Sequence, residues 1–540
     1  LKPLAQRDTY EIRKVCGKDA KIMAAGGITN WKDAVEMVLC GGNLLGVCAE
    51  TLISGYDIVR PMIRGMKEYM DRHGYQNLED FCGKIVPEVR TAPELTLYDG
   101  YAHIKEPRLS GPCKAACPLH VPVQAYVQEI AQGKFREAYE RILRQGALQG
   151  ACAYVCSHPC EDACVRGDQG DPVRIRELKR FVLELGRSKG WTVPEKKPAS
   201  NGLKAAVIGS GPRGLTCAET LADAGYAVTI FEKDTEPGGA LRLLVSGGRL
   251  PEAVWKQIRQ GAEAKGITLQ TGCAVTPEEL RQQGFDAVAQ AADPKERPET
   301  DGYALLETAE DLKQKKVVIY GRSLAVFDMA LAAKRAGADV RIAGGRWNEK
   351  QRGLQDLLRQ MKQEGIPVTG GLEFETLTQT QAVFRGPAGE TVTLACDRFY
   401  RGENISKSAS IPAAAAKGLE LAARIDHELR GAEATLQAPE GCVPVKKEAV
   451  LRRSGYIGDT RQAAASIQTE AEAMQEAGRC LKCGCGEGCQ LCKTICTDFA
   501  PYIAGEDCLA IAPSECVACG MCFNRCPNRN IEMINKGQKV

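Results

Sequence analysis

Two successive strand–helix patterns organise the first 75 residues of the chain. Apolar runs in KIMAAGGI and NLLGVCAE predict buried strands, and each is followed by an amphipathic helical period, NWKDAVEMVLCG and SGYDIVRPMIRGMKEYMDRHG. Parallel strands of this kind need a larger sheet around them. We therefore interpret residues 1–75 as the tail of a (β/α)8 barrel.

The pattern then changes several times and predicts a multidomain α/β protein. Turn-forming residues separate a helical, cysteine-rich region from two further α/β regions and a cysteine-dense tail. The expected segments after the barrel tail are a linker at 76–110, a helical domain at 111–195, α/β segments at 200–312, 313–390 and 391–435, a second linker at 436–475, and a cysteine-dense domain at 476–540.

Composition narrows the function classes. A chain of 540 residues is too long for one core, and its net charge of +3 with no basic block argues against nucleic-acid binding. The chain has no run of about 18 apolar residues, so no membrane span is expected. The start, LKPLAQRDTY, lacks the features of a signal peptide and an initiator Met, so a cytoplasmic fragment of a longer protein is expected.

The 25 cysteines favour metal ligation over disulfides. Their number is odd, and most lie at CxxC-like spacings in two dense groups, 113–164 and 480–526. Isolated buried thiols explain only the cysteines outside these groups. A structural zinc protein is an alternative, although zinc ligands rarely crowd into one loop as CxxCxxC.

A dinucleotide-binding pattern lies in LKAAVIGSGPRGLTCAETLADAGYAVTIFEK. A strand, a glycine-rich turn, a helix and a second strand occur in register, and the second strand leads into Glu232, where a carboxylate accepts a ribose hydroxyl. The turn places backbone amides at a helix N-terminus, where a pyrophosphate binds. The residues expected to contact it are Gly209, Ser210, Gly211, Pro212, Arg213 and Gly214.

The segment EKDTEPGGALRLLVSGGRLP resembles the glutamate synthase small subunit family, which includes the NADPH-side half of dihydropyrimidine dehydrogenase. The resemblance covers about residues 110–435. It implies two nested Rossmann-like domains and FAD bound along this segment. The implied contacts are Gly238, Gly239, Arg249 and Leu250.

Two flavin positions depart from the family. Ala291-Ala292-Asp293 stands where the family has an Ala-Thr-Gly turn, and Gly402-Glu403 stands where it has a Gly-Asp pair that contacts the ribityl chain. FAD remains the expected cofactor, and we expect its contacts at these two positions to differ from those in the family.

The second Rossmann-like pattern, KKVVIYGRSLAVFDMALAAKRAGADVRIAGGR, leaves two interpretations open. It keeps Gly321 but has Arg322 and Ser323 where the family's NADPH turn has glycines. Arg322 can pair with a phosphate and Arg346 with a 2′-phosphate, which would make this an NAD(P)H site. Alternatively the domain is empty and kept for architecture.

The tail carries the two cysteine runs of a two-cluster ferredoxin. The run at 516–526 has the bacterial CxxCxxCxxxCP spacing, in which the fourth cysteine ligates the other cluster. The crossed rule predicts two [4Fe–4S] clusters. One takes Cys485, Cys489, Cys492 and Cys526, and the other takes Cys516, Cys519, Cys522 and Cys496.

The helical domain resembles the iron–sulfur domain of the same family but lacks its opening segment. That segment resembles EAGRCLKC in the tail, with Cys480 and Cys483. The resemblance implies one cluster on Cys113, Cys164, Cys480 and Cys483. It implies a second on Cys117, Cys156 and Cys160 with an open fourth ligand, for which Cys152, Glu177 and Lys179 are nearby in sequence.

We therefore hypothesise that Cys480 and Cys483 fold back across more than 300 residues to join Cys113 and Cys164. The rival assignment gives Cys480 and Cys483 to the tail and leaves the helical domain with one cluster.

The barrel tail resembles the last units of the FMN barrels in dihydroorotate and dihydropyrimidine dehydrogenases. Gly26–Gly27 and Val47–Cys48 match residues that hold the FMN phosphate there. Because most of the barrel is absent, FMN binding by this segment is not expected.

The leading hypothesis is a flavin- and iron–sulfur-dependent oxidoreductase subunit that passes electrons between NAD(P)H, or a redox partner, and another active site. The domain order resembles flavoproteins that carry the name selenate reductase subunits. The alternative is a non-catalytic electron conduit or assembly subunit. No catalytic residue stands out, and His120 and His158 are expected to pack beside clusters or cap turns.

Overall fold

The computed structural model describes residues 2–89, 100–146, 148–193, 198–292, 302–402, 410–437, 441–454, 463, 466–505 and 508–535. The chain forms two compact units. The first is Leu1–Tyr101 with Val517–Cys519 and Asn535–Lys539, and the second is Ala102–Cys516 with Gly520–Ile534 and Val540. Glu403 and Asp293 lie outside the described residues.

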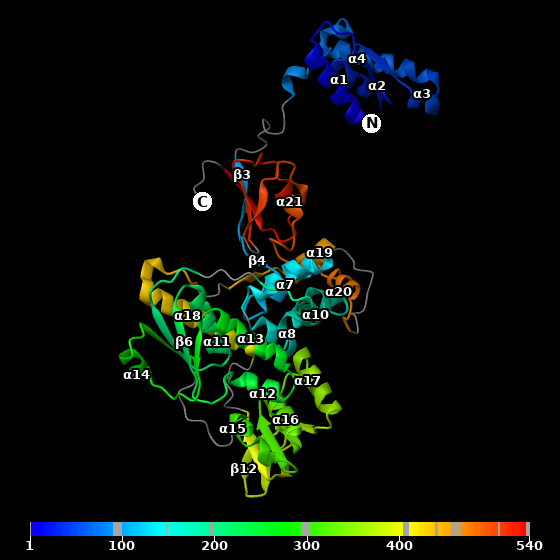
Figure 1. Ribbon diagram of the computed structural model, residues 1–540. Coiled ribbons are helices and arrows are strands. Elements are labelled where there is room, and N and C mark those ends of the chain that lie inside the picture. The colour runs from blue at the N-terminus through cyan, green and yellow to red at the C-terminus, as the bar shows by residue number, and fades with distance from the viewer. Residues whose placement is uncertain are drawn as a thin grey trace. The chain divides into compact units, whose positions relative to one another are not determined.

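The first unit contains the two strand–helix repeats expected from the sequence. Its main elements are α1 (Lys2–Cys16), β1 (Met23–Ala25), α2 (Trp31–Leu39), β2 (Leu44–Gly46), α3 (Ala49–Ser54) and α4 (Val59–His73). Strands β1 and β2 pair in parallel, and Met37 and Val38 of α2 are fully buried. The blue ribbon of Figure 1 shows these elements. The assignment of residues 1–75 to the tail of a (β/α)8 barrel stays a prediction.

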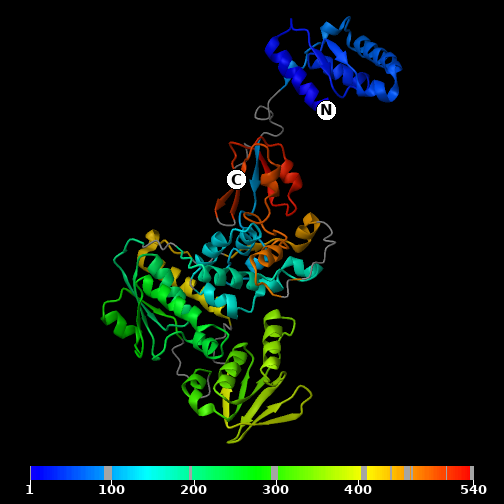
Figure 2. The same cartoon turned by 45° about the vertical axis from the view of Figure 1, so that its right-hand side comes forward.

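The second unit begins with a helical module. It contains α5 (Pro112–Ala115), α6 (Val123–Ala131), α7 (Phe135–Leu143), α8 (Gln149–Val155), α9 (Pro159–Asp162) and α10 (Ile175–Ser188). Its core includes Tyr126, Ile142 and Leu178, and Ala473 and Ala477 of α20 (Glu470–Ala477) complete it. Figures 1 and 2 show α20 beside α10, although the two are far apart in sequence.

The helix α20 falls in the expected linker at 436–475, so that segment is not a plain connector. Thr469 accepts a hydrogen bond from the Glu472 backbone N–H, and the Glu472 side chain accepts from Thr469 in return. This capping box is a local helix-start signal that the sequence displays. The segment also contains α19 (Lys447–Ser454).

A four-stranded parallel sheet forms the first Rossmann-like module. Its strands are ordered β7-β6-β5-β8, with β5 (Lys204–Ile208), β6 (Ala227–Phe231), β7 (Thr268–Gln270) and β8 (Ala287–Gln290). Its helices are α11 (Pro212–Asp223), α12 (Ala240–Ser246), α13 (Glu252–Ala264), α14 (Pro277–Gln282) and the returning α18 (Ile411–Arg430). Helices α11 and α18 touch closely, because a Cβ on Gly418 would lie 2.4 Å from the Arg213 carbonyl oxygen.

The second Rossmann-like module inserts before α18. It contains α15 (Gly302–Glu307), α16 (Ala325–Arg335) and α17 (Arg352–Gln363), and its parallel sheet is ordered β11-β10-β9-β15. Those strands are β9 (Lys316–Gly321), β10 (Asp339–Gly344), β11 (Val368–Thr369) and β15 (Arg398–Arg401). An antiparallel sheet adds β12 (Glu373–Leu377), β13 (Gln381–Arg385) and β14 (Thr391–Ala395).

The boundary expected at residue 391 therefore lies instead after β15. The reason is that β15 pairs with β9, so Phe399 lies opposite Val318 in the second sheet.

The tail contains α21 (Leu491–Ile495), β17 (Pro501–Gly505), β18 (Cys508–Ile511), α22 (Met521–Arg525) and β19 (Ile531–Asn535). Part of the expected linker at 76–110 belongs to these sheets: β3 (Gly100–Ile104) pairs with β19, and β4 (Leu109–Ser110) pairs with β16 (Val443–Pro444). Strands this short whose partners lie hundreds of residues away leave no local signal, which explains why the sequence predicts a linker.

The expected fold class, a multidomain α/β protein with a helical module and two Rossmann-like modules, is confirmed at this level. No helix within the described ranges has the length and apolar character needed to cross a membrane.

Candidate functional site

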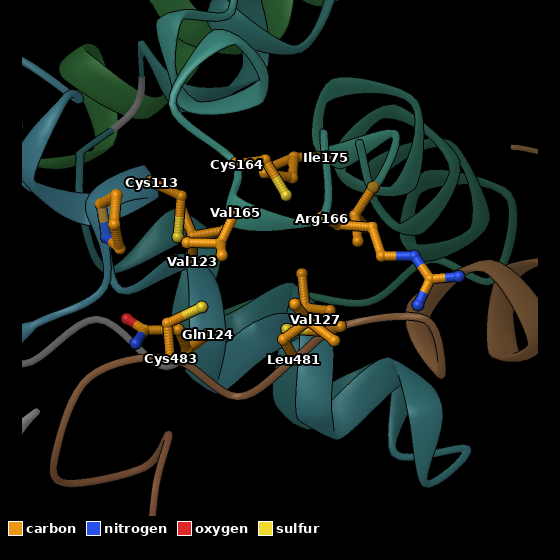
Figure 3. A pocket seen from close by; sticks show the side chains of 13 residues that line it. Cys113, Val123, Gln124, Val127, Cys164, Val165, Arg166, Ile175, Leu481 and Cys483 are labelled. Atoms are coloured by element: carbon orange, nitrogen blue, oxygen red, sulfur yellow. The ribbon is translucent and has the colours of Figure 1, made fainter. Parts of the chain in front are cut away.

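Four cysteines from opposite ends of the helical module line one pocket. Cys113 and Cys164 come from α5 and the end of α9, and Cys480 and Cys483 come from the segment after α20. Apolar side chains, among them Val127 and Ile175, complete the lining. Figure 3 shows the thiols of Cys113, Cys164 and Cys483 pointing toward the same space.

A buried ion pair holds the 480–483 segment in place. Arg479 Nη1 donates to Glu476 Oε1 at 2.6 Å, and its side chain is only 4% exposed. Arg479 also donates to the carbonyl oxygens of Pro172 and Asp171, at 3.2 and 2.6 Å, while the backbone N–H of Arg174 donates to Glu476 at 2.9 Å. The segment is therefore fixed to the loop between α9 and α10.

The thiols of this pocket are crowded enough to affect one another. Burial, followed by the charges of Cys480, Cys164 and Cys483, raises the pKa of Cys113 well above its ordinary value. Burial likewise raises the pKa of Cys480 to about 11. Cys113 and Cys483 are buried and Cys164 and Cys480 are partly buried. Four thiols with mutually unfavourable charges fit a cationic group that binds them as thiolates.

A [4Fe–4S] cluster and a single metal ion require different arrangements of their ligands. Within the described part of the chain, no three His, Cys, Asp or Glu side chains are placed to hold a single metal ion. A [4Fe–4S] cluster takes one thiolate at each iron, so its ligands surround a volume instead of a point.

A second thiol group lies on the same module. Burial, then the charges of Cys156 and Cys117, raises the pKa of Cys160, and the same two thiols contribute to the raised pKa of Cys152, about 12. Cys152 is 4% exposed. Of the three fourth ligands left open by the sequence, Cys152 and Lys179 lie near this group, because the charges of its thiols act on Cys152 and the charge of Lys179 acts on Cys156. Lys179 also donates to Gln149.

The third candidate, Glu177, is engaged elsewhere, because its carboxylate accepts from Arg180 Nη2 at 2.6 Å. His120 and His158 both adopt left-handed backbone conformations. His120 Nδ1 lies 3.3 Å from the Sγ atom of Cys442.

The tail brings together the first of its two expected ligand sets. Burial and the charges of Cys489, Cys526 and Cys492 raise the pKa of Cys485, and a hydrogen bond from Asn530 opposes this rise. Asn530 contributes two contacts, from its backbone N–H to Cys526 Sγ at 3.3 Å and from its amide to Cys485 Sγ at 3.7 Å.

Single members of the second expected tail set have the following surroundings. Cys516 Sγ accepts from the Ala102 backbone N–H at 3.3 Å, Cys522 is buried near Cys492, and Cys496 caps the C-terminus of α21. Cys519 is exposed. Ligation by every one of these cysteines stays a prediction.

The expected dinucleotide turn forms between β5 and α11. Gly209 has a φ of +101°, and a Cβ on Gly214 would lie 1.8 Å from the Gly209 carbonyl oxygen, so both positions need glycine. Glu232 accepts from the backbone N–H of Ser210 at 2.9 Å and from its hydroxyl at 2.6 Å. The Glu232 carboxylate therefore also stabilises the turn through Ser210.

Two observations fit an anion at this turn. The Nε atom of Arg213 is buried and has no hydrogen-bond partner among the described residues. A Cβ on Gly211 would meet nothing within 4 Å, so the space beside the turn is open to a ligand. A pyrophosphate would occupy such a space and accept from such a donor.

The other expected flavin contacts have structural partners. Gly238 has a φ of +118° and packs on Trp255, and Gly239 is the N-cap of α12. Arg249 pairs with Asp328 of the second module, and Leu250 lies in the core.

In the second Rossmann-like module, side chains occupy part of the space at the strand ends where a nucleotide would bind. Arg322 packs against Gly345, and the Arg322 carbonyl oxygen accepts from Trp347 Nε1 at 3.1 Å. The Trp347 ring covers Gly344, where a Cβ would lie 1.9 Å from it. Arg346 is exposed. Gly402 packs within 3.3 Å of where a Gly321 Cβ would lie.

Comparisons with known proteins agree with these assignments at the level of domains. Residues 109–191 match the family model of dihydropyrimidine dehydrogenase domain II with its 4Fe-4S cluster, and residues 207–252 match that of an NAD(P)-binding Rossmann-like domain. The chain thus carries an iron–sulfur domain and a nucleotide-binding domain.

Three curated relatives illustrate the similarity. The beta subunit of NADP(+)-dependent formate dehydrogenase from Moorella thermoacetica is 30% identical over 43% of this chain and 39% of its own length. The NADPH glutamate synthase small chain of Bacillus subtilis is 30% identical over 32% of this chain and 36% of its own. The subunit PreT of an Escherichia coli NAD-dependent dihydropyrimidine dehydrogenase is 34% identical over 32% of this chain and 43% of its own.

The chain therefore spans less than half the length of these relatives. The resemblance to glutamate synthase small chains and dihydropyrimidine dehydrogenase subunits is confirmed, and the relatives are oxidoreductases or their subunits. A solved 2-naphthoyl-CoA reductase covers 88% of this chain at 16% identity with a TM-score of 0.35, too low to establish a shared overall fold.

Sequence reasoning missed the polar residues that position the thiols. Glu476 and Arg479 stand three residues apart beside Cys480, a spacing that brings two side chains together on a helix, and this was the available signal. Asp356 and Arg176, which contact the Cys156–Cys160 loop, leave no signal in the sequence.

A Gly211→Ala variant tests the nucleotide turn. Gly211 has an ordinary φ of −68°, and its Cβ would meet no protein atom, so the fold should be unchanged. A pyrophosphate seated on the turn would be obstructed. We expect at least about tenfold weaker flavin binding, about 1.4 kcal/mol, measured as flavin bound per chain against free flavin concentration.

Gly261→Ala on α13 is the matched control, because a Cβ there also meets nothing within 4 Å. Full flavin retention by Gly211→Ala would argue against cofactor binding at this turn.

Proposed function

We propose that this chain is an FAD- and iron–sulfur-dependent oxidoreductase subunit that passes electrons between NAD(P)H, or a redox partner protein, and another active site. The observation that carries the proposal is the convergence of Cys113, Cys164, Cys480 and Cys483 on one pocket, in a chain that also carries a nucleotide-binding module. Two ends of the chain then share one metal site, which gives the tail a fixed place on the flavin module.

Each cofactor has identifiable residues. The two thiol groups of the helical module and the cysteine runs of the tail would hold [4Fe–4S] clusters, and the 209–214 turn with Arg213 and Glu232 would hold FAD. FAD exchanges hydride with a nicotinamide and releases single electrons, which iron–sulfur clusters carry. Because the named relatives are subunits, a partner protein that supplies or accepts these electrons belongs to the proposal.

Iron counting tests the shared site. The variants Cys113→Ala/Cys164→Ala and Cys480→Ala/Cys483→Ala should each lose the same cluster, about four irons per chain. The quadruple variant should lose no more iron than either double variant, because all four residues serve one site. Iron and acid-labile sulfide per chain provide the measurement.

Additive losses, about eight irons in the quadruple variant, would instead support separate sites. Cys273→Ala is the control, because this thiol lies in the first Rossmann-like module, where its Sγ contacts the Thr271 carbonyl oxygen. Zinc without acid-labile sulfide would contradict the iron–sulfur assignment.

A second candidate function is a non-catalytic electron conduit that does not accept hydride from a nicotinamide. The packing of Arg322 on Gly345 and of Trp347 on Gly344 favours it. Both side chains lie at the carboxyl ends of β9 and β10, where a nucleotide binds in open α/β sheets.

Anaerobic addition of NADPH or NADH separates the two functions. If the leading function is correct, we expect the flavin absorbance at about 450 nm to fall within seconds of mixing with one of the two nucleotides. Bleaching of the flavin by dithionite but by neither nucleotide would support the function as a non-catalytic electron conduit. An Arg322→Gly/Trp347→Ala variant, which reopens the strand ends, should bleach faster if these side chains restrict the site.

A further inference from the structure

A helix of the second Rossmann-like module lies directly on a cysteine loop of the helical module. The contact joins α17 to the loop between Cys156 and Cys160. It is close at the backbone level, since a Cβ on Gly353 would lie 2.8 Å from Ser157 atoms. The backbone N–H of Arg352 also donates to Asp162 at 3.3 Å.

One carboxylate on α17 connects to two side chains of the helical module. Asp356 Oδ2 lies 3.2 Å from His158 Nε2 and accepts from Arg176 Nη2 at 3.0 Å. The hydrogen bond from His158, together with the charge of Arg176, holds the pKa of Asp356 below its usual range, so the carboxylate is charged at neutral pH. A carboxylate can only accept, so His158 Nε2 is the donor.

Both partners of Asp356 lead to Cys156. The backbone N–H of His158 donates to Cys156 Sγ at 3.3 Å, and Arg176 Nη1 donates to the Cys156 carbonyl oxygen at 3.1 Å. His158 adopts a φ of +43°, which is uncommon for a residue with a side chain. Its ring is 4% exposed, so the same residue joins the buried contact with Asp356 to the backbone N–H that donates to Cys156 Sγ.

Other charges surround the same ring. His158 Nδ1 lies 3.2 Å from Glu161 Oε2, and the Arg176 backbone N–H donates to Glu161 Oε1 at 2.8 Å. On the solvent side, Arg359 pairs with Asp356 at 3.1 Å.

We propose that Asp356 is a positioning residue for the thiol site at Cys117, Cys156 and Cys160. It tethers His158 so that the backbone N–H of that residue donates to Cys156 Sγ, and in this way it links the second Rossmann-like module to the reduction potential of the site. Hydrogen bonds to sulfur are one of the factors that determine cluster potentials, and residues behind the ligands tune metal sites. This inference rests on the proposed function, because it requires a cluster on these cysteines.

The sign of the potential change tests the inference. An N–H···S bond stabilises the more negative, reduced state, so its loss in Asp356→Ala should lower the midpoint potential. Removing a negative charge acting only through space would raise it. We expect a fall equivalent to about a tenfold change in the one-electron reduction equilibrium, about 59 mV.

The measurement is a redox titration of the full-length, cluster-loaded protein followed by electron paramagnetic resonance. The signal of this site is the one that Cys156→Ala/Cys160→Ala removes. If that double variant loses no iron, the proposed function itself fails. If the signal is assigned but Asp356→Ala raises the potential or leaves it unchanged, only the present inference fails.

A double-mutant cycle locates the coupling. His158→Gly keeps the left-handed backbone but removes the ring, so Asp356→Ala should cause no further fall in that background. An equal fall in both backgrounds would overturn the role of His158. If His158→Gly loses iron, His158→Asn is used in its place. If Asp356→Ala loses iron, Asp356→Leu is used in its place.

Asp162→Asn is the matched control, because the Asp162 side chain also accepts from α17, and among the described residues it forms no ion pair with His158. Its potential should not fall. A fall as large as that of Asp356→Ala would show that any carboxylate of this interface has the effect, and would overturn the specific role of Asp356.

Discussion

The buried pair between Glu476 and Arg479 attaches the segment that carries Cys480 and Cys483 to the helical module. Both side chains are at most 4% exposed, and each also bonds the backbone of residues 171–174. Removing one partner of such a pair leaves an unpaired buried charge, at a cost of about 3–5 kcal/mol. The pair therefore gives the chain a single favourable way to place the segment that carries Cys480 and Cys483.

That placement puts two thiol groups next to each other along the chain. Cys483 belongs to the helical module's pocket and Cys485 to the thiols of the tail, with only Gly484 between them. A Cβ on Gly484 would lie 2.5 Å from the Gly111 nitrogen, so the backbone passes too close for another residue. Consecutive Cα atoms are about 3.8 Å apart, so the proposed cluster sites are near neighbours.

Cysteine spacing and glycine-rich turns made the candidate sites predictable from sequence. The 209–214 turn and Glu232 lie where the strand–helix–strand pattern predicts, because local backbone requirements determine such a turn. The pairing of Cys480 and Cys483 with Cys113 and Cys164 also came from counting ligands in resembling segments. The first inference uses glycines, which the tight turn requires, and the second uses cysteines, which a cluster requires in sets of four.

Features that depend on partners far along the chain were not predictable. β3 and β15 are short and pair with strands distant in sequence, so neither shows a period of its own. The contacts of Asp356 arise only when two modules meet, and nothing in the sequence around it differs from an exposed helix face. By contrast, the start of α20 has a capping box at Thr469 and Glu472, a local signal that predicts a helix within the expected linker.

The most direct test of the central claim is an anomalous difference map, recorded at the iron absorption edge from crystals of the full-length protein loaded with its cofactors. We expect an iron peak bounded by Cys113 and Cys164 on one side and by Cys480 and Cys483 on the other. An iron peak that Cys480 and Cys483 share only with cysteines of the tail, with none beside Cys113, would contradict it.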